Sequence, residues 1–244
     1  MNEIFIKQLS LDYCCSAEDL MLTENCFSIY QKLNGRRKFH EQEECFLKIA
    51  AIRGKLLFTG RQEMIHWCKE QFSNTNPAWF FEPATLALIN AKLHEYGYEI
   101  AQIHPFYIAY TPTPIEPQDL VIQWYNTQEI EQFRGDARFC ESYSFDTDAP
   151  DVLGVSASKS GELLGMAGAS ADSPYFWQIG INVLPYAQGH GIATILTTLL
   201  KNRVLSMGKI PYYGTAFSHI ASQNVAVKSG FRPAWCELTT RKIQ

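Results

Sequence analysis

Two glycines stand directly ahead of an apolar-periodic segment in the second half of the chain, in the stretch Gln188-Gly189-His190-Gly191-Ile192-Ala193-Thr194. Residues 195–205 repeat leucine and valine at helical spacing. The first backbone N–H groups of a helix have no intrahelical acceptor, and the helix dipole adds partial positive charge there. Glycine lets an anion approach the backbone closely. The sequence therefore predicts a phosphate-binding loop at a helix N-terminus.

Two common phosphate-binding motifs do not fit this loop. The P-loop requires a lysine after its last glycine, but Ile192 follows Gly191 here. The dinucleotide fingerprint Gly-x-Gly-x-x-Gly belongs to a parallel unit, whereas this loop reads Gly-x-Gly-x-Ala. It follows three expected strands at 151–158, 162–170 and 175–184. The short polar turns between these strands predict an antiparallel meander.

A longer pattern includes the same loop. Gln188, Gly191 and Ala193 have the spacing Gln-x-x-Gly-x-Ala, and Val183, at the expected strand end, stands five residues earlier. This pattern resembles the acetyl-CoA site of the GNAT superfamily of N-acetyltransferases, where it reads Gln/Arg-x-x-Gly-x-Gly/Ala. The alternative is a glycine-rich turn that merely caps a helix.

A second motif lies near the end of the chain. After an expected strand at 211–216 and an expected helix at 220–229, the ending Lys228-Ser229-Gly230-Phe231 resembles the family's Lys-x-Gly-Phe helix terminus. The resemblance covers about residues 150–235 and implies an α/β (α+β) fold with a mixed, mostly antiparallel sheet flanked by helices. It also implies acetyl-CoA as co-substrate and no metal. The family usually ends with two strands, and the 13 residues after Phe231 allow one strand or two short ones.

The resemblance assigns the cofactor contacts position by position. Backbone groups of the strand before the loop would pair with the pantetheine arm, and the amides of the loop would hold the pyrophosphate. The last helix would line the arm through His219 and Ser222. The implied cofactor-binding residues are Ile181, Asn182, Val183, Gln188, Gly189, His190, Gly191, Ile192, Ala193, Thr194 and Ser222.

Acetyl transfer to an amine needs an acceptor for the amine proton. It also needs a donor to the thioester oxygen, such as the N–H of Asn182 or Val183, and a donor for the departing thiolate. The residues that many members use for the proton transfers are absent. Ala226 stands where tyrosine is common, and residues 176–178 hold no carboxylate.

Three side chains are candidates for the missing roles. His219 is the most attractive acid or base because the ordinary histidine pKa lies near neutral pH; the alternative is a histidine that only caps or packs at a helix start. Asp172 and Glu162 are weaker candidates, with solvated turn carboxylates as their alternative.

A proline-rich connector divides the chain. Residues 111–117 hold three prolines, and each fixes its own backbone and favours an extended residue before it. We expect an N-terminal α/β domain of unknown role at 1–110 and an acetyl-CoA-binding domain at 118–244. Residues 1–110 resemble the N-terminal part that some GNAT members carry, which is either a degenerate copy of the fold or a related α/β extension. Further patterns predict a helix after Ser16, a hairpin at 46–59, helices at 61–72, 82–96 and 128–145, and a strand at 103–110.

Composition limits the function further. The chain has 244 residues, 46% of them apolar, and a net charge of −4, which argues against broad nucleic-acid binding and against disorder. We find no apolar run long enough to span a membrane and no signal peptide, so we expect a cytoplasmic protein. The seven cysteines include no CxxC pair, which disfavours zinc and suits thiols packed in the core.

The sequence thus predicts an acetyl-CoA-dependent N-acetyltransferase that acts on a primary amine by direct transfer in a ternary complex. The alternative is a non-catalytic acyl-CoA-binding sensor or scaffold. The expected acceptor is a small-molecule or peptide amine, with no nucleic-acid or membrane partner, and the chain could form a homodimer. A different phosphate ligand, such as a nucleotide, fits less well because no nucleotide motif is complete.

Overall fold

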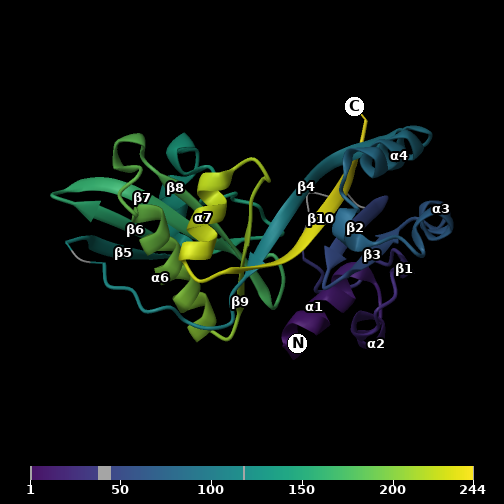
Figure 1. Cartoon of the computed structure of the whole chain (residues 1–244). Coiled ribbons are helices and arrows are strands. Elements are labelled where there is room, and N and C mark those ends of the chain that lie inside the picture. The colour runs from purple at the N-terminus through teal and green to yellow at the C-terminus, as the bar shows by residue number, and fades with distance from the viewer. Residues whose placement is uncertain (1, 38–44, 118, 244) are drawn as a thin grey trace. The chain divides into compact units, whose positions relative to one another are not determined.

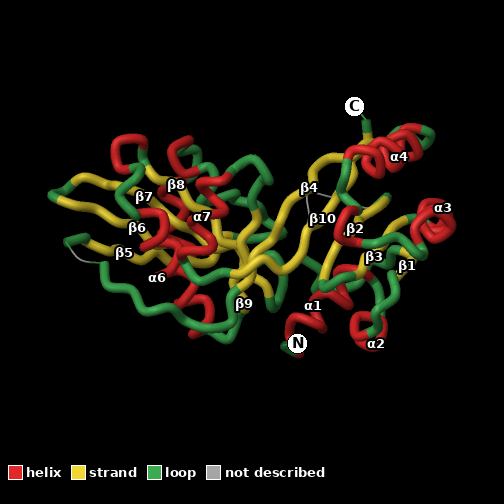
Figure 2. The backbone as a smooth tube through the Cα atoms, viewed as in Figure 1, coloured by secondary structure: helices red, strands yellow, loops and turns green. Residues whose placement is uncertain are grey.

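The computed structural model describes residues 2–37, 45–117 and 119–243 (Figure 1). The described chain forms two compact units, one of Met1–Phe106 with Ala234–Gln244 and one of Tyr107–Pro233. Both units contain helices and strands, as Figure 2 shows. The predicted α/β class is confirmed, and the strand pairing is mixed, with parallel pairs β1/β3 and β8/β9 among antiparallel ones.

The first unit has the strand order β1-β3-β2-β10-β4. Its helices supply hydrophobic side chains that pack with β2 and β3, including Met64 and Phe72 of α3 and Ile89 and Leu93 of α4. The elements are α1 (Glu3–Tyr13), α2 (Ala17–Met21), β1 (Cys26–Ile29), β2 (Leu47–Ile52), β3 (Lys55–Gly60), α3 (Gln62–Phe72), η1 (Pro77–Trp79), α4 (Pro83–His94), β4 (Tyr98–Ile108) and β10 (Arg232–Lys242).

Local chemistry explains why several predicted elements of this unit form. Ser16 caps α2 in a reciprocal pair with Asp19, which confirms the predicted helix start. The predicted hairpin pairs β2 with β3 around Arg53 and Gly54, both with positive φ, at 50° and 78°. Helix α1 and strand β1 were not predicted from the sequence.

The end of the chain forms one strand, β10, rather than two short ones. Residues Cys236 to Thr239 pair antiparallel with Ala51 to Lys48 of β2, so the last residues belong to the first unit. The compact units therefore divide the chain differently from the expected boundaries at 110 and 118 and the expected end of the second domain at 244. The connector residues 111–117 lie in the second unit, where Thr113 exchanges two hydrogen bonds with Asn202, of 2.9 and 2.7 Å.

The second unit has the strand order β9-β8-β7-β6-β5, with the end of β4 beside β9. The predicted meander is confirmed by antiparallel pairing of β5 through β8. Its elements are β5 (Val121–Asn126), α5 (Thr127–Ile130), η2 (Glu131–Phe133), η3 (Ala137–Phe139), β6 (Asp151–Lys159), β7 (Glu162–Ser170), β8 (Phe176–Val183), η4 (Pro185–Ala187), α6 (Ile192–Ser206), β9 (Ile210–Gly214) and α7 (Ile220–Lys228).

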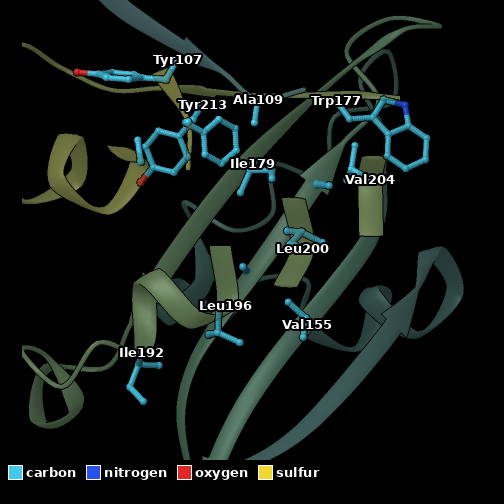
Figure 3. Close-up of a cluster of buried hydrophobic side chains, with 14 of the residues drawn as sticks. Tyr107, Ala109, Val155, Trp177, Ile179, Ile192, Leu196, Leu200, Val204 and Tyr213 are labelled. Atoms are coloured by element: carbon cyan, nitrogen blue, oxygen red, sulfur yellow. The ribbon is translucent and has the colours of Figure 1, made fainter. Parts of the chain in front are cut away.

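The two faces of this sheet are covered differently. Leu196, Leu200 and Val204 of α6 pack with Val155 and Ile179 of the strands on one face (Figure 3). The other face carries a second cluster formed largely by residues 125–145. The single helix predicted at 128–145 was wrong: α5 and two short 3-10 turns form instead, and Gly135 between them has a φ of 82° that no α-helix contains.

Candidate active site

Strands β8 and β9 are paired along only part of their length. The parallel register joins Phe176 to Ile210, Trp177 to Pro211 and Gln178 to Tyr212, and it ends there. On its other side β8 stays paired with β7 as far as Val183. Within the described strands, residues 179–183 of β8 therefore have no partner in β9, and the sheet opens along this edge.

The pairing register decides which backbone groups face the opening. Leu184 N–H donates to Leu164 O at 2.9 Å, so the backbone groups of even-numbered residues of β8 point toward β7. Those of Ile181 and Val183 point toward the opening, as the resemblance implied. The main chain of Asn182 points the other way. Asn182 therefore does not present its N–H to the opening, because the register turns it toward β7.

The side chain of Asn182 has a positioning role instead. Its Oδ1 accepts hydrogen bonds from the N–H groups of Glu141 and Ser142, at 3.0 and 2.8 Å, and from Ser142 Oγ at 2.9 Å. The same segment crosses the sheet over two glycines: a Cβ at Gly180 would clash with Glu141 O, and one at Gly168 with Ser142 O. These contacts hold Glu141 against β8 beside the opening.

The glycine-rich loop follows directly at the end of β8. Gly189 and Gly191 have φ values of 81° and 79°, a backbone conformation that residues with a Cβ adopt only under strain. Gly191 O accepts the first hydrogen bond of α6, from Ile195 N–H at 3.0 Å. The N–H groups of residues 192–194 come before that bond and so have no acceptor within the helix. The predicted helix N-terminus with exposed glycines is present.

The other residues of the predicted pyrophosphate loop, Gln188, His190 and Thr194, have different environments. Gln188 N–H donates to Pro185 O at 3.4 Å, and Gln188 Nε2 lies 3.4 Å from Val183 O, so this residue links the strand end to the loop. His190 is exposed. Thr194 O accepts a hydrogen bond from Ser229 Oγ at 3.2 Å, which joins α6 to the end of α7.

Tyr213 supplies a buried hydroxyl next to the opening. It follows Tyr212, the last β9 residue paired with β8, and its hydroxyl lies 2.9 Å from Ser222 Oγ on α7. Burial raises the pKa of Tyr213, the Ser222 hydrogen bond partly offsets this, and the nearby Glu141 carboxylate raises the pKa further. Tyr213, labelled in Figure 3, belongs to the same buried cluster as Ala226. The hydroxyl therefore stays protonated at neutral pH, close to the position where the family's tyrosine is missing.

Asp172 is buried at the closed end of the opening. It accepts hydrogen bonds from Ser170 Oγ at 2.6 Å and from the Tyr212 hydroxyl, which also lies 3.0 Å from Gln178 Oε1. The alternative of a solvated turn carboxylate does not hold for Asp172, because this network takes it out of water. Glu162 is exposed and is the first residue of β7.

His219 is exposed at the residue before α7, and its side chain makes no capping hydrogen bond. Its main chain is fixed by Ala216 O and by Gln223 N–H, both at 3.1 Å. Gln223 in turn accepts a hydrogen bond from the Tyr107 hydroxyl at 3.1 Å. The β9–α7 loop is thus held by hydrogen bonds while the imidazole faces solvent.

The part of the chain that the structure describes offers neither a metal site nor a membrane-spanning helix. No group of three or more His, Cys, Asp or Glu side chains there could hold a metal ion. None of the helices among those residues has the length and apolar content needed to cross a bilayer.

Sequence comparison gives the class of this unit. Residues 118–231 match the model of the acetyltransferase (GNAT) family. No curated protein matches the sequence at a significant level. Residues 118–231 are thus a GNAT acetyltransferase domain, as the two motifs predicted.

One solved structure shares the fold over nearly its whole length. A GCN5-related N-acetyltransferase-like protein from Streptococcus suis has a TM-score of 0.50 at 14% identity, over 97% of this chain and 98% of that one. GCN5-related N-acetyltransferases from Sphaerobacter thermophilus and Kribbella flavida have TM-scores of 0.47 and 0.46, at 14% and 15% identity, over 65% and 64% of this chain. The matches span 56% and 62% of those two chains, less than two thirds of their length.

Members of this family use acetyl-CoA, and the residues present fit that group. The opening between β8 and β9 leaves main-chain groups of Ile181 and Val183 for an extended polar chain. The loop at Gly189 and Gly191 leaves helix N–H groups for a pyrophosphate. Neither glycine has a heavy atom within 4 Å of an added Cβ, so space is open above both.

Tyr213 and Glu141 are the two site residues that sequence reasoning did not assign. Tyr213 lies within the strand predicted at 211–216, and its pairing with Ser222 depends on how α7 packs on β9. Glu141 lies in a segment predicted as helix, and no local pattern indicates that it crosses β8. The one available signal was Gly168 and Gly180 within strands, since glycine in a strand often marks a close backbone approach.

Proposed function

We propose that the protein is an acetyl-CoA-dependent N-acetyltransferase that transfers an acetyl group to a primary amine directly, within a ternary complex. The observation that carries this proposal is the opening of the sheet beyond Gln178 and Tyr212, next to a glycine-rich helix N-terminus. When bound, acetyl-CoA supplies an activated acetyl thioester.

In this proposal the chain's own groups bind and orient. The N–H groups of residues 192–194 hold the pyrophosphate. Gly189 and Gly191 have no side chain, so the pyrophosphate can approach the main chain of the loop closely. Main-chain groups of Ile181 and Val183 hold the arm extended along β8. The N–H of Ile181 or Val183, rather than that of Asn182, is then the donor available to the thioester oxygen.

Proton transfer is assigned to residues on the two sides of the opening. Tyr213, held by Ser222 and kept protonated by burial, donates a proton to the departing thiolate. Glu141 is an exposed carboxylate beside the opening and accepts the amine proton, directly or through water. His219 remains a candidate for this second role because it is exposed and free to approach an acceptor in solvent. Asp172 is better suited to fixing Tyr212 and Gln178 than to reaching an amine.

The competing function is a non-catalytic acyl-CoA-binding sensor or scaffold. Two observations favour it: Ala226 replaces the tyrosine common in the family, and Gln178 occupies a strand position where many members have a carboxylate. Both functions share the loop, so cofactor binding alone does not separate them.

The proposed acceptor is a small-molecule or peptide amine, with acetyl-CoA as co-substrate and no metal. The net charge of −4 supports the absence of a nucleic-acid partner, and we propose no membrane partner. A homodimer remains compatible with this function.

Cofactor binding is tested on the loop with a matched pair of glycine variants. Acetyl-CoA is expected to raise the melting temperature of the wild-type chain, whereas adenosine nucleotides raise it less. Gly191→Val should abolish this shift, because a Cβ at a φ of 79° costs about 1–2 kcal/mol and displaces the cradle.

Gly161→Val is the control, since Gly161 has a φ of 84° in the β6–β7 turn, away from the loop. It should lower stability by a similar amount and keep the acetyl-CoA shift. An undiminished shift in Gly191→Val would contradict the assignment of the loop.

A further inference from the structure

Gln178 lies at the closed end of the opening between β8 and β9. Its register partner is Tyr212, and this is the last pair before the two strands separate. The hydroxyl of Tyr212 contacts the side-chain amide of Gln178, at 3.0 Å, and a carboxylate oxygen of Asp172. Asp172 also accepts a hydrogen bond from Ser170 Oγ at 2.6 Å. The buried side chains of Tyr212 and Asp172 therefore fix the amide of Gln178 at the edge of the opening.

The number of protons decides which atom of this amide faces Tyr212. The Tyr212 hydroxyl has one proton, so it can donate to only one of its two partners. Hydrogen bonds from hydroxyl groups favour the ionised form of a carboxyl, so Asp172 accepts this proton. An amide oxygen has no proton to give, so a half-turn of the Gln178 amide must place its NH2 group toward the Tyr212 oxygen. The carbonyl oxygen of Gln178 is then left for another partner.

This oxygen is available to a ligand on the face of β8 that Glu141 crosses. Gln178 is half-buried, and within the described part of the chain its side chain makes no hydrogen bond except that to Tyr212. Residues two apart on a strand share a face and are separated by about 6.5 Å. Gln178 therefore shares a face with Gly180, whose added Cβ would clash with Glu141 O. A neutral hydrogen-bond acceptor and the residue that carries the carboxylate are thus neighbours on one face of β8.

We propose that Gln178 selects primary over secondary amines as acceptors, an inference that rests on the acetyl transfer proposed above. A primary amine attacks the thioester in its neutral form, with two N–H groups. One N–H donates to the Gln178 oxygen and stays on the nitrogen. The other N–H loses its proton to Glu141 as the C–N bond forms and the C–S bond breaks. The departing thiolate takes a proton from Tyr213.

A secondary amine has a single N–H group, and that hydrogen must leave before the amide is complete. The Gln178 oxygen then has no partner on the acceptor, which has displaced water from it. An acceptor group left unpaired in this way lowers kcat/KM about tenfold. The methyl group of a secondary amine also slows attack by its size, so the role of Gln178 is measured as the change in the preference when its oxygen is removed.

The test measures kcat/KM for thiol release by the full-length chain with a panel of primary amines and the N-methyl derivative of each. The panel runs from glycinamide and sarcosinamide to peptides that begin with glycine or with sarcosine. Gln178→Met keeps the length of the side chain and removes the oxygen, so the preference for the primary amine should fall about tenfold. Its affinity for acetyl-CoA, measured by calorimetric titration, should equal that of the wild type.

Gln123→Met is the matched control. Gln123 is an exposed glutamine of β5, at the other end of the strand order β9-β8-β7-β6-β5, and its variant should keep the wild-type preference. Tyr212→Phe keeps Gln178 but removes the hydroxyl that fixes its amide, so this variant should lose part of the preference. Tyr212→Phe decides the question if Gln178→Met does not fold.

The contrary outcomes separate this inference from the proposed function. A wild type that acetylates amines without a preference for primary ones overturns the role of Gln178 alone. So does a preference that is unchanged in Gln178→Met or, where that variant does not fold, in Tyr212→Phe. A wild type that acetylates no amine of the panel overturns both the role of Gln178 and the acetyl transfer on which it rests.

Discussion

At the scale of single residues, the site differs from its family mainly in where a hydroxyl comes from. Ala226 supplies none, but Tyr213 on β9 reaches Ser222 on α7 at 2.9 Å. Because burial raises the pKa of Tyr213, the hydroxyl remains a donor over the pH range in which a cysteamine thiolate must be protonated. The proton donor would thus reach the opening from a strand rather than from a helix.

Tyr213→Phe removes that donor and keeps the ring. We expect kcat for acetyl transfer to fall about 100-fold, as for loss of a general acid, with the affinity for acetyl-CoA unchanged. Steady-state kinetics and calorimetric titration measure the two quantities. Ser222→Ala should give a smaller fall in kcat. A Tyr213→Phe variant with wild-type kcat would remove Tyr213 from the mechanism.

At the scale of elements, α6 both supplies the unpaired N–H groups that follow the loop and fixes the connector. Lys201 is fully buried, and its Nζ donates to Thr111 O at 3.2 Å and to Thr113 Oγ1 at 2.5 Å. Burial lowers the pKa of Lys201 to about 8. Keeping the Lys201 ammonium charged in this buried position therefore costs stability at neutral pH, and its hydrogen bonds to Thr111 and Thr113 partly offset that cost.

The linkage of this lysine to folding gives a prediction. Between pH 8 and 10.5 the unfolded chain binds more protons at Lys201 than the folded chain does, so the free energy of unfolding gains a contribution that rises with pH. Lys201→Met lacks that contribution. As the pH rises from 8 to 10.5, the free energy of unfolding of the wild type should therefore increase by roughly 1–3 kcal/mol relative to that of Lys201→Met. Urea denaturation at each pH measures both values. Lys228→Met changes an exposed lysine of α7 and is the control: its free energy of unfolding should follow that of the wild type at a constant offset across this pH range. The same constant offset for Lys201→Met would contradict the prediction.

The elements themselves were predicted where the signal is local. Strand β7 lies at the predicted 162–170, and the loop before α6 was identified from its glycines and the apolar spacing that follows. The direction of the Asn182 main chain was not, because it depends on the register between β7 and β8. The broken helix at 128–145 was missed since aromatic spacing suggested one helix, while Gly135 interrupts it.

At the scale of the whole molecule, each unit has its own core, and the chain returns to the first unit at its end. Glu237 of β10 lies in a buried ionic cluster of that unit: its Oε2 is 2.9 Å from Arg37 Nη2 and 3.3 Å from Trp235 Nε1, and it accepts from the Tyr13 hydroxyl. Arg37 also pairs with Asp12 at 2.5 Å. This cluster joins residues 12, 13 and 37 to residues 235 and 237, so no local sequence pattern could have indicated it.

Removing one partner from a buried ion pair leaves an uncompensated charge. Glu237→Ala should therefore lower the free energy of unfolding by about 3–5 kcal/mol. Glu99→Ala, which breaks the exposed pair with Arg241 in the same unit, should cost less than about 1 kcal/mol. Chemical denaturation of both variants measures the difference. Equal losses in the two variants would mean that the cluster does not anchor β10.

The central claim is acetyl transfer by the second unit, and one measurement tests it most directly. The purified chain is mixed with acetyl-CoA and a panel of amines, amino acids and peptides with free amino termini, and thiol release is followed together with the mass of the acceptor. We predict acceptor-dependent thiol release with one acetyl group gained per thiol released. Tight acetyl-CoA binding with no acceptor-dependent thiol release across the panel would contradict the proposal that the protein is an enzyme and would favour the non-catalytic sensor.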